Sequence, residues 1–89
     1  FTGVCIDTAC SLGMCAERAA AAAMVTAGEN RIIALAAVMQ DGRAGAPCGA
    51  CREFLLQLAP ENAGAKVLLD EKSLAFSTLK NLMPHIWFK

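Results

Sequence analysis

A Cys-x-x-Cys pair at the predicted start of a helix is the feature that most restricts how this chain of 89 residues folds. Cys48 and Cys51 follow Pro47, and an amphipathic segment continues from them to Pro60. A helix start places the two sulfurs about one turn apart, close enough to bind one metal ion, and its dipole favours thiolates. The same spacing is typical of redox pairs in thioredoxin-like units, but those follow the first strand of a βαβ unit and this pair comes late.

A second helix is predicted from about Cys15 to Ala27, because its Ala run favours helix and Gly28 suits a C-terminal cap. If both helix starts lie beside one sheet, three thiolates can surround one zinc ion and leave the fourth tetrahedral position open, as catalytic sites do. Glu17 then lies near the ion without binding it, where a carboxylate can transfer a proton. For Glu17 alone, a contact with the helix dipole is the simpler interpretation.

The overall composition excludes several classes of protein. Five cysteines, an odd number, and no visible secretory signal argue against a disulfide scaffold and predict a cytoplasmic protein. The apolar runs are too short for a membrane helix, and a formal net charge of zero argues against nucleic-acid binding. A hydrophobic content of 56% excludes disorder and predicts a homo-oligomer, although the many Ala residues explain part of it.

Strand-like segments alternate with the helices. Phe1–Asp7 alternates like the end of a strand, Arg31–Met39 predicts a strand covered on both faces, and Lys66–Asp70 predicts a short buried strand. The other expected elements are loops at Ser11–Met14 and Gln40–Pro47, a helix from Cys48 to just before Pro60, a short helix at Thr78–Met83 ended by Pro84, and an apolar tail, His85–Phe88, that packs on the rest. This order indicates an α/β fold with parallel strand pairing.

Together the two motifs resemble the signature of the zinc-dependent cytidine deaminase family, in which Cys-x-Glu or His-x-Glu is followed by Pro-Cys-x-x-Cys. The Cys-Ala-Glu-Arg run from Cys15 and the Pro-Cys-Gly-Ala-Cys-Arg run from Pro47 are similar to the three-Cys branch that acts on free nucleosides, which includes relatives of blasticidin S deaminase. Thr78–Pro84 is similar to the segment of that branch that ends in Leu-Leu-Pro. The resemblance implies an α/β fold with α/β/α layers, in which helices cover the faces of a mixed sheet. It also implies that the homo-oligomer is a tetramer or a dimer.

The resemblance also implies a function. Zinc would be held by Cys15, Cys48 and Cys51, and Glu17 would move the proton. The implied reaction is hydrolytic deamination of cytidine, deoxycytidine or a close cytosine nucleoside analogue at the ring carbon that bears the amino group, with release of ammonia.

Further site residues are implied by the same resemblance. The backbone N–H of Ala16 and the carbonyl of Ala46 would bind the pyrimidine, and Asp7 would accept a hydrogen bond from a sugar hydroxyl. Three thiolates and Zn²⁺ carry a net charge of minus one, which Arg18 and Arg52 would offset if each donated a hydrogen bond to a thiolate. The simpler interpretation of either Arg is a solvated helix residue.

The sequence departs from the family in two places. The family's N-terminal helix and first strand, with a Tyr/Phe-rich pocket segment, have no counterpart in the single domain expected over residues 1–89. Cys5 stands where the family commonly has Asn, so sugar recognition differs. Cys5 and Cys10 are expected to be buried as small hydrophobes, and His85 is expected to be a surface or packing residue. The alternative function is therefore a catalytically incomplete, zinc-stabilised module or assembly fragment of the same fold.

Overall fold

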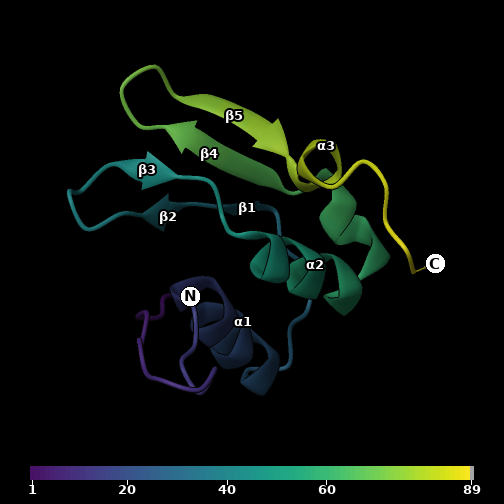
Figure 1. Ribbon diagram of the computed structural model, residues 1–89. Coiled ribbons are helices and arrows are strands. Elements are labelled where there is room, and N and C mark those ends of the chain that lie inside the picture. The colour runs from purple at the N-terminus through teal and green to yellow at the C-terminus, as the bar shows by residue number, and fades with distance from the viewer. Residues whose placement is uncertain (89) are drawn as a thin grey trace. The chain divides into compact units, whose positions relative to one another are not determined.

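In the computed structural model, which describes residues 1–88, the chain divides into two compact units, Phe1–Asn30 and Arg31–Lys89. The first unit is built on helix α1 (Ala16–Thr26), and the second combines short strands with helices (Figure 1). The second unit contains a mixed sheet, so the expected α/β class with a mixed sheet and helices is confirmed. None of the helices among residues 1–88 is long and apolar enough to span a membrane.

Helix α1 forms where the sequence predicts it. Cys15 precedes it in an extended conformation, with φ −69° and ψ 148°. At its other end Gly28 has φ +88°, a left-handed conformation that favours Gly. The Gly28 N–H donates to the Val25 carbonyl at 2.9 Å, and the Glu29 N–H donates to the Met24 carbonyl at 3.1 Å. This pair of bonds is the Schellman arrangement, which satisfies the last carbonyls of the helix.

The Ala run of α1 allows a very close approach by the N-terminal segment. A Cβ atom placed on Gly3 would come within 2.5 Å of the Ala20 nitrogen and 2.8 Å of the Ala16 oxygen. Only Gly fits there, and side chains larger than Ala on this side of α1 would push the segment away. Small residues on the two segments therefore fix how they pack together.

The strand predicted at Phe1–Asp7 is wrong. Within the described residues this segment forms a single antiparallel bridge, in which Ile6 and Met14 exchange two backbone hydrogen bonds of 2.9 Å. Alternation alone does not make a strand, because a strand needs a neighbour with which to pair. Cys5 and Cys10 are exposed on this segment, so the expectation that both are buried is also wrong.

The sheet of the second unit has the strand order β1-β4-β5 (Figure 1). β1 (Ala34–Leu35) runs parallel to β4 (Lys66–Asp70), and β5 (Ala75–Thr78) runs antiparallel to β4. Val67, the second residue of β4, is fully buried and lies opposite Ser77. β5 was not predicted. The strand at Lys66–Asp70 and the parallel pairing are confirmed, although Val67 is the one residue of this strand that is buried.

The long strand expected at Arg31–Met39 is divided in the structure. Ala36 separates β1 from β2 (Ala37–Val38). β2 pairs antiparallel with β3 (Ala44–Gly45), which lies inside the expected loop. Ile33 is 80% exposed and Val38 is 72% exposed, so the strand is not covered on both faces. β1 lies at the edge of its sheet and β2 belongs to a separate hairpin, which explains why the apolar run remains accessible.

Helix α2 (Gly49–Leu58) begins and ends close to the predicted positions. Cys51, Leu55 and Leu56 are buried along it, whereas Phe54, expected on the same apolar side, is partly exposed. A 3₁₀ helix, η1 (Pro60–Gly64), follows and was not predicted. Its Asn62 is fully buried, accepts a hydrogen bond from the Ile32 N–H at 2.6 Å and donates one to the Leu55 carbonyl at 2.9 Å.

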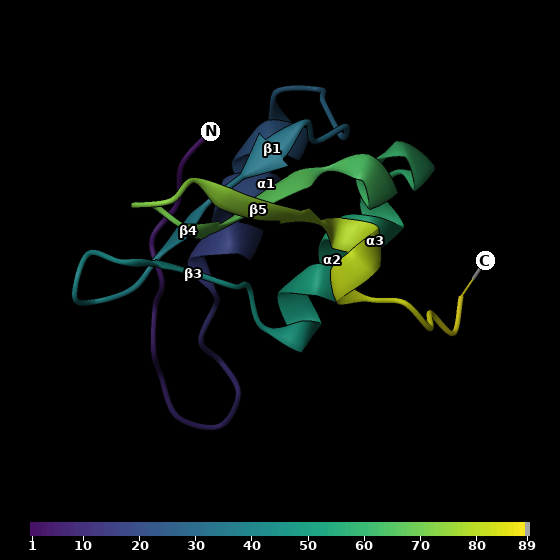
Figure 2. The same cartoon turned by 90° about the horizontal axis from the view of Figure 1, so that it is seen from above.

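The C-terminal segment returns to α2. The short helix α3 (Leu79–Leu82) lies against α2 (Figure 2) and begins at Thr78, whose hydroxyl accepts a hydrogen bond from the Asn81 N–H at 3.2 Å. Leu79 is fully buried. Beyond Pro84, His85 is exposed as expected. Trp87 is 78% exposed although its indole N–H donates to Glu53 on α2, so the tail packs less closely than predicted.

Candidate active site

The Cys-x-x-Cys pair lies at the start of α2, as the sequence predicts. Cys48 precedes the helix in an extended conformation (φ −67°, ψ 166°), and Cys51 lies in its first turn. Their two Sγ atoms are within 4.8 Å of each other. Two sulfurs bound to one tetrahedral zinc ion at about 2.3 Å lie about 3.8 Å apart, so this pair fits one ion with little movement. Cys51 is fully buried while Cys48 is exposed, so the pair opens to solvent on the side of Cys48.

The segment that leads into this pair is held by Arg52. The Arg52 Nε donates to the Pro47 carbonyl at 2.7 Å, and its Nη1 donates to the Leu82 carbonyl at 3.2 Å. The sequence suggested a thiolate as the partner of Arg52, whereas these two acceptors are backbone carbonyls. Pro47 itself is fully buried, so both the ring and the carbonyl of this residue are fixed.

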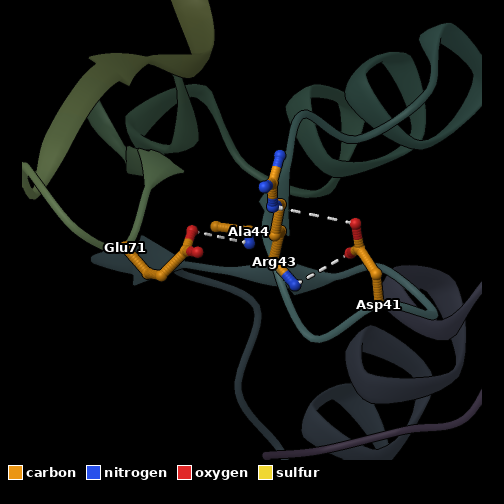
Figure 3. Close-up of polar contacts among 4 residues, drawn as sticks. All are labelled: Asp41, Arg43, Ala44 and Glu71. Carbon is orange, nitrogen blue, oxygen red and sulfur yellow. Dashed lines mark hydrogen bonds and ion pairs between the residues drawn. The ribbon is translucent and has the colours of Figure 1, made fainter.

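Upstream, β3 is held by a carboxylate that the sequence analysis did not single out (Figure 3). The Ala44 N–H donates to Glu71 Oε2 at 2.9 Å, which joins β3 to the turn between β4 and β5. Asp41 accepts a hydrogen bond from the Arg43 N–H at 3.0 Å and forms an exposed ion pair with its side chain, which contributes little to stability. Ala46 follows directly after β3 and is exposed. No sequence pattern marks Glu71, because its partner lies 27 residues away.

The other motif lies at the start of α1 in the first unit. Cys15 precedes the helix, Ala16 and Glu17 form its first turn with Arg18, and all four are half-buried. Glu17 is the acidic residue of this first turn, where the helix dipole favours a negative charge.

Cys5 and Asp7 lie near this helix start. The Cys5 thiol donates to Asp7 Oδ1 at 3.6 Å, a distance that suits sulfur. Desolvation and then the negative charge of Asp7 raise the pKa of the Cys5 thiol, with a smaller contribution from Cys15, while the N–H of Ala16 lowers it. Because the combined effect raises the pKa, Cys5 remains a protonated donor at neutral pH.

The predicted site residues are therefore divided between the two units. The first unit carries Cys15, Glu17 and the predicted pyrimidine, sugar and thiolate partners Ala16, Asp7 and Arg18. The second unit carries Cys48, Cys51, Ala46 and Arg52.

Comparison with known sequences gives a consistent result. No family model matches the chain. Two curated proteins of Mycobacterium tuberculosis strains, each described as a cytidine deaminase, are 41% identical to it over 59 residues. The match includes 66% of this chain and 41% of each relative, so the chain spans about two fifths of the length of the curated relatives it matches.

Solved structures show the same similarity over more of the chain. The crystal structure of cytidine deaminase from Mycobacterium leprae has a TM-score of 0.77 and 29% identity, covering 93% of this chain and 66% of that one. The crystal structure of cytidine deaminase from Mycobacterium tuberculosis has a TM-score of 0.78 and 27% identity, covering 94% of this chain and 64% of that one.

Proposed function

Because this chain is a homologue of cytidine deaminases in both sequence and structure, we propose that it catalyses the zinc-dependent hydrolytic deamination of cytidine, deoxycytidine or a close cytosine nucleoside analogue. The observation that carries the proposal is the pair of thiols at the start of α2, whose spacing suits one metal ion. The start of α1 adds a third thiol, Cys15, and the carboxylate of Glu17.

The donor set fits zinc. Cys15, Cys48 and Cys51 each offer one sulfur, and thiolates are ligands that zinc accepts readily. Three protein ligands leave a fourth position for water, which is the pattern of catalytic zinc sites. When bound there, zinc acts as a Lewis acid that makes a water molecule a stronger nucleophile at neutral pH.

The proposed roles of the other residues follow from their chemistry. Glu17 takes a proton from the attacking water and delivers it to the neighbouring ring nitrogen while the hydroxyl adds at the ring carbon. It then moves the remaining hydroxyl proton to the amino group, so that the C–N bond breaks and ammonia leaves. The N–H of Ala16 and the carbonyl of Ala46 orient the pyrimidine, and Asp7 accepts a hydrogen bond from a sugar hydroxyl. Arg18 donates to a thiolate and offsets the negative charge of the three-thiolate site.

The proposal also includes the setting of the reaction. Residues 1–89 act as a single cytidine-deaminase-like domain in the cytoplasm, without nucleic acid or membrane as a partner. A homo-oligomer is supported by large apolar side chains that are exposed in the second unit, among them Ile33, Val38 and Phe76.

The second candidate is a zinc-stabilised module of the same fold without turnover. It is favoured by the two thiols at the start of α2, whose spacing suits a metal ion whether or not a substrate is converted.

A substrate panel separates the two candidates. The zinc-loaded chain is incubated with cytidine, deoxycytidine, adenosine and blasticidin S, and each compound is followed by mass. Replacement of an amino group by oxygen adds about one dalton, and we expect this shift for at least one cytosine compound. A zinc-loaded chain that shifts none of them contradicts the deaminase proposal and supports the module.

A further inference from the structure

The guanidinium of Arg52 joins three parts of the second unit. Arg52 lies in α2, directly after Cys51, and its Nε donates to the Pro47 carbonyl at 2.7 Å. Its Nη1 donates to the carbonyl of Leu82, the last residue of α3 and 30 residues further along the chain. One side chain thus links the start of α2, the segment before it and the end of α3.

Both acceptors need a donor of this kind. Leu82 ends α3, so its carbonyl has no partner in a further helical turn, and a cation at a helix C-terminus is favoured. Pro47 lies just before α2 and its ring is fully buried, so its carbonyl is also confined. A planar guanidinium can donate to two fixed acceptors at once, whereas a Lys ammonium is a flexible point charge.

The Pro47 carbonyl is placed between two groups of the proposed reaction. Its peptide bond carries the nitrogen of Cys48, which is a proposed zinc ligand. On its other side Pro47 is bonded to Ala46, whose carbonyl is proposed to bind the pyrimidine. Fixing the Pro47 carbonyl restricts Cys48, because the two share one rigid peptide plane. It also restricts Ala46, because the proline ring fixes the φ angle between that plane and the preceding one.

We propose that Arg52 is a positioning residue, which holds the Ala46–Cys48 segment in the geometry that binds zinc and the pyrimidine. This inference rests on the proposed function for the pyrimidine, while its zinc part can be tested without turnover. Partners that orient metal ligands from outside the ligand set commonly change metal affinity or activity by about 10- to 100-fold when removed.

The test compares Arg52→Lys with Arg43→Lys in the zinc-loaded chain. Arg43 is a matched control, because its side chain is 71% exposed and, within residues 1–88, forms only a long ion pair with Asp41. We measure the rate at which zinc passes to a colorimetric chelator, the KM and kcat for cytidine, and the midpoint of thermal unfolding. Arg52→Gln is measured in parallel, so that a variant that fails to fold does not end the test.

We expect Arg52→Lys to release zinc about tenfold faster and to raise the KM for cytidine, while Arg43→Lys matches the wild-type chain. The unfolding midpoint of Arg52→Lys should stay close to that of the wild-type chain, although its zinc is released faster. Zinc release and KM within twofold of wild type for Arg52→Lys and Arg52→Gln would overturn the inference, including when the unfolding midpoint falls. Faster zinc release in a chain whose wild type does not deaminate cytidine would support the positioning of Cys48 and reject the proposed function separately.

Discussion

At the scale of single residues, the groups with proposed chemical roles lie at two helix starts. Cys15 and Cys48 each precede a helix in an extended conformation, and Glu17 and Cys51 each lie in the first turn. A helix start collects unpaired N–H groups and a partial positive charge, which favour thiolates and carboxylates. The same local geometry therefore serves both motifs.

Asp7 is expected to control the ionisation of Cys5. The Asp7 carboxylate helps to raise the pKa of the Cys5 thiol, after desolvation, so less thiolate is present at a given pH than in an unperturbed thiol. In Asp7→Asn the negative charge is removed, so the pKa should fall and alkylation of Cys5 by iodoacetamide should begin at lower pH. Peptide mass mapping over a pH series measures this, with Cys10 as the internal control. Identical pH profiles for Cys5 in both chains would contradict the assignment.

The local geometry of the proposed site residues was predictable in part, because each motif is local. The spacing of Cys48 and Cys51 requires only one helical turn, and the structure has that turn where predicted. Neither the role of Glu71 nor the hydrogen bond from Arg52 to the Leu82 carbonyl was predictable, since these bonds join residues 27 and 30 positions apart. Long-range contacts between a side chain and the backbone leave no periodic pattern in a sequence.

At the scale of elements, helices were predicted better than strands. α1 and α2 carry their own boundary signals, with Gly28 after one and Pro60 after the other. Strands depend on partners, so Phe1–Asp7 alternates without forming one and Ala75–Thr78 forms one without a marked pattern. The division of Arg31–Met39 has the same origin, because β1 and β2 pair with different neighbours.

Asn62 is expected to be the polar residue on which the second unit depends most. It is fully buried and joins Ile32, just before β1, to Leu55 in α2 by two hydrogen bonds. Asn62→Ala leaves a part-buried N–H and a buried carbonyl without these bonds, which should lower the free energy of unfolding by about 2–4 kcal/mol. Urea denaturation measures the change, with Asn81→Ala as an exposed control expected within about 0.5 kcal/mol of wild type. A loss for Asn62→Ala no larger than for the control would contradict this role.

At the scale of the whole molecule, the proposed zinc ligands come from both compact units. Cys15 belongs to the first unit, while Cys48 and Cys51 belong to the second. If all three hold one ion, part of the free energy of zinc binding is also free energy of folding for the whole chain. Large apolar side chains of the second unit are exposed, as expected for a small chain that buries a limited core of its own. They leave more of its stability to come from metal binding.

The most direct test of the account is the rate of cytidine deamination by the wild-type chain and by Glu17→Gln, at equal measured zinc content. We predict that the wild-type chain converts cytidine to a product about one dalton heavier and releases ammonia. Glu17→Gln should retain its zinc and lose the rate by about 10²- to 10⁴-fold, because an amide cannot transfer the proton. No product from the zinc-loaded wild-type chain, or equal rates in the two chains, would contradict the account.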